Sequence, residues 1–149
     1  MNYWHRFRNH FFGFIVAWLV LSQLGIIIST QFVMASLVNM GVEVPFSMRL
    51  DTTWHDMVSM MPLFSIIFGT GFLIAMLVGT VLTRWIKILP ELVYTLAGFA
   101  AVGTTLWSIK TAFQITPIAA ARSATGIIAL CLAGAVAGYI YQRMTNKPR

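Results

Sequence analysis

Four residues with metal-binding side chains lie close together near the start of the second apolar stretch of the sequence. They are one imidazole and three thioethers: His55, Met57, Met60 and Met61. Imidazole and thioether groups suit Cu(I), but methionine is also a flexible filler of irregular helix packing. No copper-binding motif repeats at a fixed spacing. The cluster therefore predicts either packing against other helices and lipid or a copper site.

A second candidate site is built around a cation. Arg122 is expected one or two turns inside the fourth apolar helix, where a charge is costly unless it extends to the interface or is paired. Asp51 and Asp56 are acidic residues expected near the same membrane interface, as are His55 and Lys110. The sequence predicts that Arg122 extends to the lipid headgroups, pairs with Asp51 or Asp56, or binds an anion or headgroup.

His55 and Asp56 could in principle serve as an acid–base pair at a lipid–water boundary. Neighbouring residues on a helix point about 100° apart, so these two do not form a natural dyad. A helix cap for Asp56 and an interfacial imidazole for His55 are the simpler interpretation. The phosphate-loop, dinucleotide-binding and zinc-protease motifs are absent from the sequence. We therefore favour a non-enzymatic protein and expect no bound cofactor, while the question of an enzyme stays open: an interfacial enzyme acting on lipid is the third functional hypothesis.

The very apolar composition determines which kind of protein, and which structural elements, can hold these candidate residues. Of the 149 residues, 58% are hydrophobic and 9% are charged, whereas a soluble domain carries about 25% charged residues. The composition excludes a soluble globule and a disordered chain. The net charge of +6 forms no basic face, so nucleic acid is not an expected partner. The single cysteine, Cys131, excludes an internal disulfide framework.

Four apolar stretches are each long enough to cross a membrane, which takes about 20 residues. Their expected bounds are 11–40, 54–83, 90–110 and 117–141. A polar outer loop over 41–53 precedes the second helix, and residues 53–56 have the form of a helix start. Pro62 should kink or split that helix. Short connections predict one all-α domain over 1–149, a four-transmembrane-helix antiparallel bundle.

Basic residues are distributed unevenly between the two sides of this bundle. One side holds seven of the ten Lys and Arg residues, and the other holds Arg49, Lys110 and Arg122. The positive-inside rule then places both termini in the cytoplasm, and we expect a multi-pass protein of a bacterial inner membrane. No Asp, Glu, Lys, Arg or His falls in the middle third of a span, which argues against a proton-coupled transporter.

The fourth stretch is rich in small residues, which allow the close backbone contacts that hold helices together in lipid. Gly134 and Gly138 form a G-x-x-x-G pair, and Gly126 lies about two turns earlier. These glycines are expected to pack against another helix of the same chain, against a second copy, or against a larger membrane-protein complex.

Three functional hypotheses follow. The leading one is a non-enzymatic accessory or structural subunit that packs through its small-residue-rich fourth helix against itself or a larger complex in the lipid bilayer. The alternative is an outer-face binding or transport protein, which holds a lipid headgroup or anion near Arg122, or copper near His55 and the methionines. The lipid-acting enzyme is the third.

Overall fold

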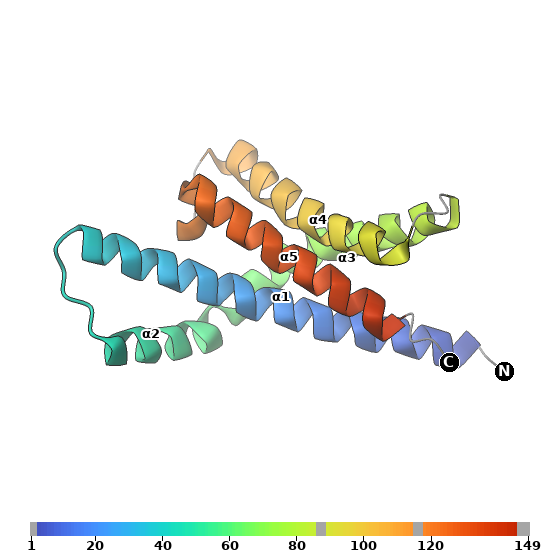
Figure 1. Ribbon diagram of the computed structural model, residues 1–149, viewed down its shortest axis with the longest axis horizontal. Coiled ribbons are helices and arrows are strands. Elements are labelled where there is room, and N and C mark those ends of the chain that lie inside the picture. Colours follow the sequence, from blue (N-terminus) through green and yellow to red (C-terminus); the bar gives the residue numbers. More distant parts are fainter. Residues whose placement is uncertain (1–2, 86–88, 115–117, 146–149) are drawn as a thin grey trace.

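The computed structural model describes residues 3–85, 89–114 and 118–145 (Figure 1). Four of its helices are long and apolar enough to cross a membrane. The chain is therefore a small integral membrane protein with an all-α fold, as its composition predicts. Within the described residues the elements, in chain order, are α1 (Tyr3–Asn39), α2 (Phe46–Ser59), α3 (Met61–Trp85), α4 (Pro90–Phe113), the short 3-10 helix η1 (Ala119–Arg122) and α5 (Ala124–Thr145).

The four long helices form a bundle in which each helix contacts two neighbours. In cross-section α1 packs against α3, α3 against α4, α4 against α5, and α5 against α1. Consecutive spans run in opposite directions, so α1 begins and α5 ends at the same end of the bundle (Figure 1). We call this the terminal end, and we call the opposite end, where α1 turns into α2, the hairpin end.

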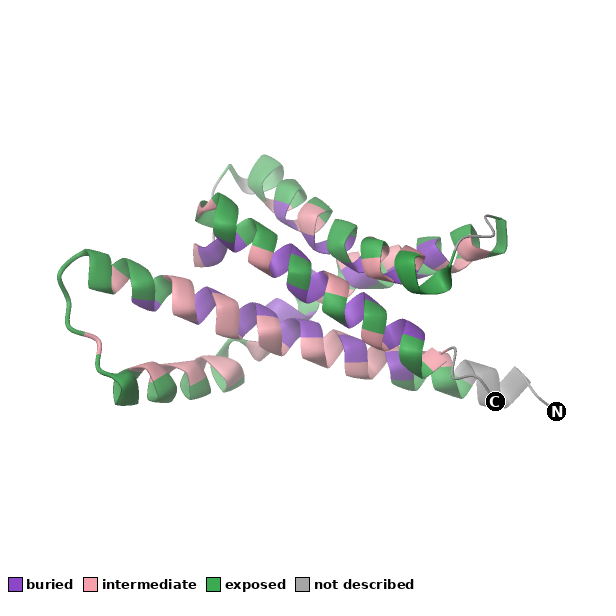
Figure 2. Cartoon of the chain, viewed as in Figure 1, coloured by how far each residue is buried: buried purple, intermediate pink, exposed green. Residues whose placement is uncertain are grey.

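Buried residues line the faces that the helices turn toward one another (Figure 2). Phe68 and Phe72 of α3 and Leu21 of α1 are at most 1% exposed and lie in one hydrophobic cluster. The outward faces are also apolar, with Ile66 and Leu96 both more than 60% exposed. An apolar outer face suits a bundle whose surroundings are lipid tails.

Glycines allow α4 and α5 to meet backbone to backbone. A Cβ atom added to Gly134 would collide with the Gly98 carbonyl oxygen, and one added to Gly98 would collide with the Gly134 carbonyl oxygen. A Cβ atom on Gly138 would meet the Tyr94 carbonyl oxygen in the same way. The G-x-x-x-G pair of α5 is therefore in contact with α4 of the same chain.

The second apolar stretch differs from the prediction at its start. The predicted loop over 41–53 is correct only for residues 41–45, because residues 46–53 are helical and belong to α2, and the predicted start at residue 54 is wrong. The Thr53 hydroxyl donates to the Arg49 carbonyl oxygen at 2.7 Å, as threonine does inside a helix, and does not cap one. The split expected near Pro62 falls two residues earlier, at Met60. Pro62 lies in the first turn of α3, where its missing N–H costs no helical hydrogen bond.

The fourth stretch begins with a break. The predicted start at residue 117 lies outside the described residues, and α5 begins only at Ala124, after η1. Ser123 separates the two helices in an extended conformation, and its hydroxyl accepts a hydrogen bond of 3.1 Å from the Gly126 N–H. This is the geometry of a serine N-cap. Arg122 therefore ends η1 and does not lie within α5.

The remaining bounds differ only at their ends. The first helix begins at Tyr3, earlier than the predicted residue 11, and α4 ends at Phe113, beyond the predicted residue 110. The fourth span continues to Thr145, beyond the predicted residue 141.

Candidate functional site

The first helix is too long for a single perpendicular crossing. It has 37 residues, which span about 55 Å at about 1.5 Å per residue, whereas the hydrocarbon core of a bilayer is about 30 Å thick. Its last part packs against α2, and the two form a helical hairpin, residues 27–59, that extends beyond the other helices (Figure 1). This α1–α2 hairpin contains the candidate site.

Two polar contacts fix how α2 is rotated against α1. The buried Thr30 hydroxyl donates to Asp56 Oδ2 at 2.8 Å. One residue along α1, Gln31 Nε2 donates to the Thr53 hydroxyl at 3.2 Å. Thr53 and Asp56 are three residues apart and therefore lie on the same face of α2, so this face is turned toward α1.

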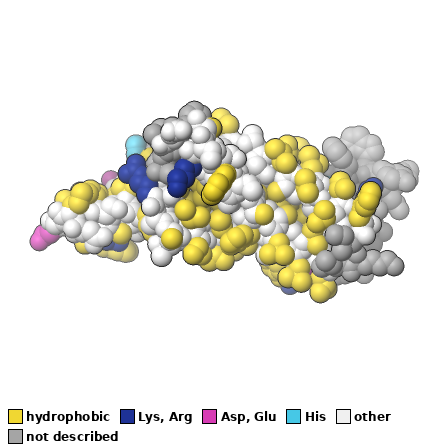
Figure 3. All heavy atoms as spheres, turned by 90° about the horizontal axis from the view of Figure 1, so that it is seen from above, with side chains coloured by type: hydrophobic (Ala, Val, Ile, Leu, Met, Phe, Trp, Pro, Cys, Tyr) yellow, Lys and Arg dark blue, Asp and Glu magenta, His cyan; other side chains and the backbone are white. Residues whose placement is uncertain are grey.

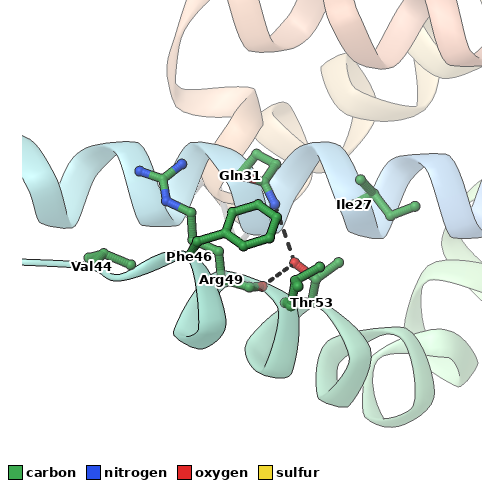
Figure 4. Close-up of a pocket in the computed structure, with 7 residues that line it drawn as sticks. Ile27, Gln31, Val44, Phe46, Arg49 and Thr53 are labelled. Carbon is green, nitrogen blue, oxygen red and sulfur yellow. Dashed lines mark hydrogen bonds between the residues drawn. The ribbon is translucent and has the colours of Figure 1, made fainter.

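A groove of about 560 Å³ opens between the two helices near the tip of the hairpin (Figure 4). This volume falls in the range of roughly 300–1,000 Å³ that is typical of small-molecule sites. Four of its lining side chains are apolar and three are polar. They are Ile27, Val44, Phe46 and Leu50, together with Gln31, Arg49 and Thr53. We call this the hairpin groove.

Arg49 is the charged residue of the hairpin groove. Its side chain is half-buried and reaches across from α2 toward α1, near the ring of Phe46 (Figure 4). Within the described part of the chain, its guanidinium has no hydrogen-bond or ion-pair partner. A half-buried cation in a mostly apolar groove is stabilised by a bound anion, because burial without a counter-charge is unfavourable.

The residues of the predicted anion site lie in different surroundings. Lys110 is exposed in the last turn of α4, and Arg122 is exposed at the end of η1. Figure 3 shows basic side chains close together toward the hairpin end of the molecule. Asp51 is exposed on α2, whereas the Asp56 carboxylate accepts the Thr30 hydrogen bond and so helps to hold the hairpin.

The residues of the predicted copper site differ in their exposure. His55 is exposed, whereas Met57 and Met61 pack against the hydrophobic core. Residues two apart on a helix point about 200° apart, so His55 and Met57 occupy opposite sides of α2. Met60, which lies between α2 and α3, is 42% exposed. Among the residues that the structure describes, no three His, Cys, Asp or Glu side chains form a metal-binding group.

Gly126 contacts the segment that precedes its own helix. A Cβ atom on Gly126 would collide with the Ala120 carbonyl oxygen of η1. Together with the contacts of Gly134 and Gly138, this means that all three predicted packing glycines are covered by the same chain.

The hairpin groove was not predicted from the sequence, although a signal for α2 was present. Arg49, Thr53 and Asp56 follow each other at the spacing of one helical face, and Phe46, Leu50, Trp54 and Val58 repeat every fourth residue. Both patterns were missed because residues 46–53 were interpreted as a loop.

Comparisons with known proteins add no relative from which a function could be transferred. No family model matches the chain, and no curated protein or solved structure is significantly similar to it.

Proposed function

We propose that this integral membrane protein is a non-enzymatic binding protein for an anionic amphiphile, a molecule that joins a negatively charged head to an apolar chain. The ligand would occupy the hairpin groove. The observation that carries the proposal is the half-buried Arg49 guanidinium, which has no polar partner in the described residues and shares its groove with four apolar side chains.

The polar side of the hairpin groove suits an acceptor group on the ligand. A guanidinium presents a planar set of N–H donors that matches a carboxylate or phosphate in two-point contact. Gln31 uses one N–H of its amide on Thr53, which leaves its second N–H as a further donor. The Thr53 hydroxyl proton is already donated to the Arg49 carbonyl oxygen. The unused donors are thus the Arg49 guanidinium and the second Gln31 N–H, and the positive charge of Arg49 favours an anion over a cation.

The apolar side of the groove suits a hydrocarbon chain. Ile27 lies on α1, Val44 precedes α2, and Phe46 and Leu50 lie on α2. Burial of apolar area stabilises a bound chain by about 25 cal/mol per Å². Both an anionic phospholipid and a free fatty acid combine a negative head with such a chain, and these are the two sources that the test must separate.

Ligand binding is better supported than an accessory subunit that packs through the fourth helix. That hypothesis depended on Gly126, Gly134 and Gly138 as a contact surface for a partner. All three glycines are buried and meet η1 or α4 of the same chain. The outward residues of α5 include the large side chains of Ile128 and Leu132, so a partner on this helix would meet these side chains and not the three glycines.

The test is native mass spectrometry of the purified full-length protein in a neutral detergent. Phosphatidylglycerol, phosphatidylcholine, palmitate and inorganic phosphate are added separately at equal concentrations. The proposal predicts that phosphatidylglycerol or palmitate binds at one molecule per chain, and that phosphatidylcholine and inorganic phosphate bind more weakly. Retention of phosphatidylglycerol alone identifies a phospholipid, and retention of palmitate alone identifies a fatty acid.

Two results would contradict the proposal. Equal binding of phosphatidylglycerol and phosphatidylcholine would mean that the anionic head is not recognised. Binding of inorganic phosphate as strong as that of the amphiphiles would mean that the apolar lining contributes nothing. A multiple of the 16.6 kDa chain mass without a bound amphiphile would favour the accessory-subunit hypothesis instead.

A further inference from the structure

The outward side of α2 is divided into two lines of residues. One line is apolar, consists of Phe46, Leu50, Trp54 and Val58, and is between 58% and 75% exposed. We call it the α2 stripe. The next line around the helix is polar and also exposed, and it consists of Ser47, Asp51, His55 and Ser59. Each line repeats every fourth residue, and the lines lie about 100° apart.

The rotation of α2 that exposes the stripe is fixed by the hairpin itself. The hydrogen bonds from Thr30 to Asp56 and from Gln31 to Thr53 hold the face of α2 next to the stripe, about 100° around the helix, against α1. Rotating α2 to bury the stripe would break both bonds. The four large apolar side chains of the stripe therefore need a cover from outside the chain, since an apolar helix face is unfavourable in water.

The stripe continues onto a span whose outer face is in lipid. Only Met60 separates α2 from α3, and its N–H still donates to the Asp56 carbonyl oxygen at 2.9 Å, as in a helix. The spacing of four residues runs on from Val58 through Pro62 to Ile66, and all three are exposed. Because α3 is a membrane span, the surface that contains Ile66 faces acyl chains.

We infer that the α2 stripe lies in the bilayer, against the acyl chains of the leaflet at the hairpin end. The exposed polar line beside it faces the headgroups and water, as in other helices that lie at a membrane interface. Trp54 in the middle of the stripe is a residue type enriched at this depth. Tilting of α1 brings the hairpin closer to the bilayer, because tilt is one way in which a long span fits a thinner bilayer.

This inference stands apart from the proposed function, although the two share residues. Phe46 and Leu50 belong to the stripe and also line the hairpin groove. The groove therefore opens on the side of the stripe, and an amphiphile can reach it from within the leaflet without crossing water.

The test is spin labelling of the full-length chain in vesicles of phosphatidylethanolamine and phosphatidylglycerol. The buried Cys131 is first replaced (Cys131→Ala), and single cysteines are introduced by Leu50→Cys and Val58→Cys in the stripe. Asp51→Cys and Ser59→Cys in the polar line are the matched controls, each one residue away. Leu63→Cys on the exposed face of α3 serves as the lipid reference. Collision rates of each label with oxygen and with a water-soluble nickel chelate are measured.

We expect the ratio of oxygen to nickel collisions at positions 50 and 58 to match that at position 63. The same ratio should be several-fold lower at positions 51 and 59. High nickel accessibility at both stripe positions would show a hairpin that stands in water and would overturn the inference. Low accessibility to both reagents would show that protein covers the stripe, and it would overturn the inference equally. Phosphatidylglycerol binding by the wild-type chain is measured separately, so either conclusion can fail alone.

Discussion

The Thr30 hydroxyl of α1 donates a hydrogen bond of 2.8 Å to the Asp56 carboxylate of α2. Thr30 is 2% exposed, so the contact ties α2 to the buried face of the long first helix. It acts with the neighbouring Gln31–Thr53 bond to set the rotation of α2. That rotation turns Arg49 into the hairpin groove and leaves the α2 stripe on the outside.

Removing the Thr30 hydroxyl should loosen the hairpin. In Thr30→Val the shape of the side chain is kept and the half-buried Asp56 carboxylate loses a donor, which costs about 1.5–3 kcal/mol for a hydrogen bond to a charged group. The loss should be local to α2, because α3 to α5 keep their contacts. Hydrogen–deuterium exchange measures it as faster exchange of the amides of residues 49–59.

Thr111→Val is the matched control for this change. The Thr111 hydroxyl bonds only to backbone carbonyls of its own helix, at 3.0 Å from Trp107, and the residue is exposed. We expect an effect within about 0.5 kcal/mol. Unchanged α2 exchange in Thr30→Val would mean that the hydrogen bond does not hold the hairpin.

An added methyl group should destabilise the contact between α4 and α5 at Gly98 and should be tolerated at Gly103. Gly98→Ala places a Cβ atom on the Gly134 backbone, so helix separation must change, and overpacking of this kind costs about 1–3 kcal/mol. Gly103→Ala on the same helix meets only Cys131 Sγ, at 3.6 Å, an ordinary contact. Alanine is there the better helix former by about 1 kcal/mol, so stability should hold or rise.

Unfolding in sodium dodecyl sulfate, followed by tryptophan fluorescence, measures both variants. Because Gly98 and Gly134 belong to one chain, the loss in Gly98→Ala should be the same at different protein concentrations. A loss that appears only at high concentration would point to contact between copies, and equal stabilities of the two variants would contradict the close backbone contact.

Filling the hairpin groove should abolish binding without unfolding the protein. Ile27 is half-buried and lines the groove from α1, so the indole of Ile27→Trp would occupy the space of a ligand chain. Leu63→Trp adds the same group to the exposed face of α3 and serves as the control. Native mass spectrometry should then detect the amphiphile on Leu63→Trp and not on Ile27→Trp. Equal retention on both would place the ligand elsewhere.

The sequence predicted the spans well because a helix that crosses a membrane needs one long apolar run of residues. A run of about 20 apolar residues is a strong signal, and all four runs form long helices. The bounds at residues 54 and 117 were less accurate for separate reasons. The mixed segment 46–53 has the low mean hydropathy of a loop, and its helical spacing becomes visible only when apolar and polar positions are compared. The alanines before Arg122 favour a helix, but Ser123 caps a new one at that point.

The site was less predictable than the spans because it depends on which residues of two helices face each other. Arg49 was recognised only as one charge of a polar loop, whereas Arg122 stood out by its position in an apolar stretch. Nothing in the sequence indicated that Gln31 of α1 would meet Thr53, since the pairing is set by how α2 folds back. Likewise, the glycine pattern of α5 predicted close packing correctly, but it could not specify that the contacting helix would be α4 of the same chain.

The most direct test of the account is the affinity for phosphatidylglycerol of two variants that each remove one positive charge from the hairpin end. Arg49→Gln removes a charge-assisted contact of about 1.5–3 kcal/mol, so its Kd should rise roughly 10- to 100-fold. Lys110→Gln removes an exposed charge outside the groove, and its Kd should stay within about twofold, as expected for a screened surface charge. An unchanged Kd in Arg49→Gln, or an equal rise in both variants, would contradict a groove that binds its ligand through Arg49.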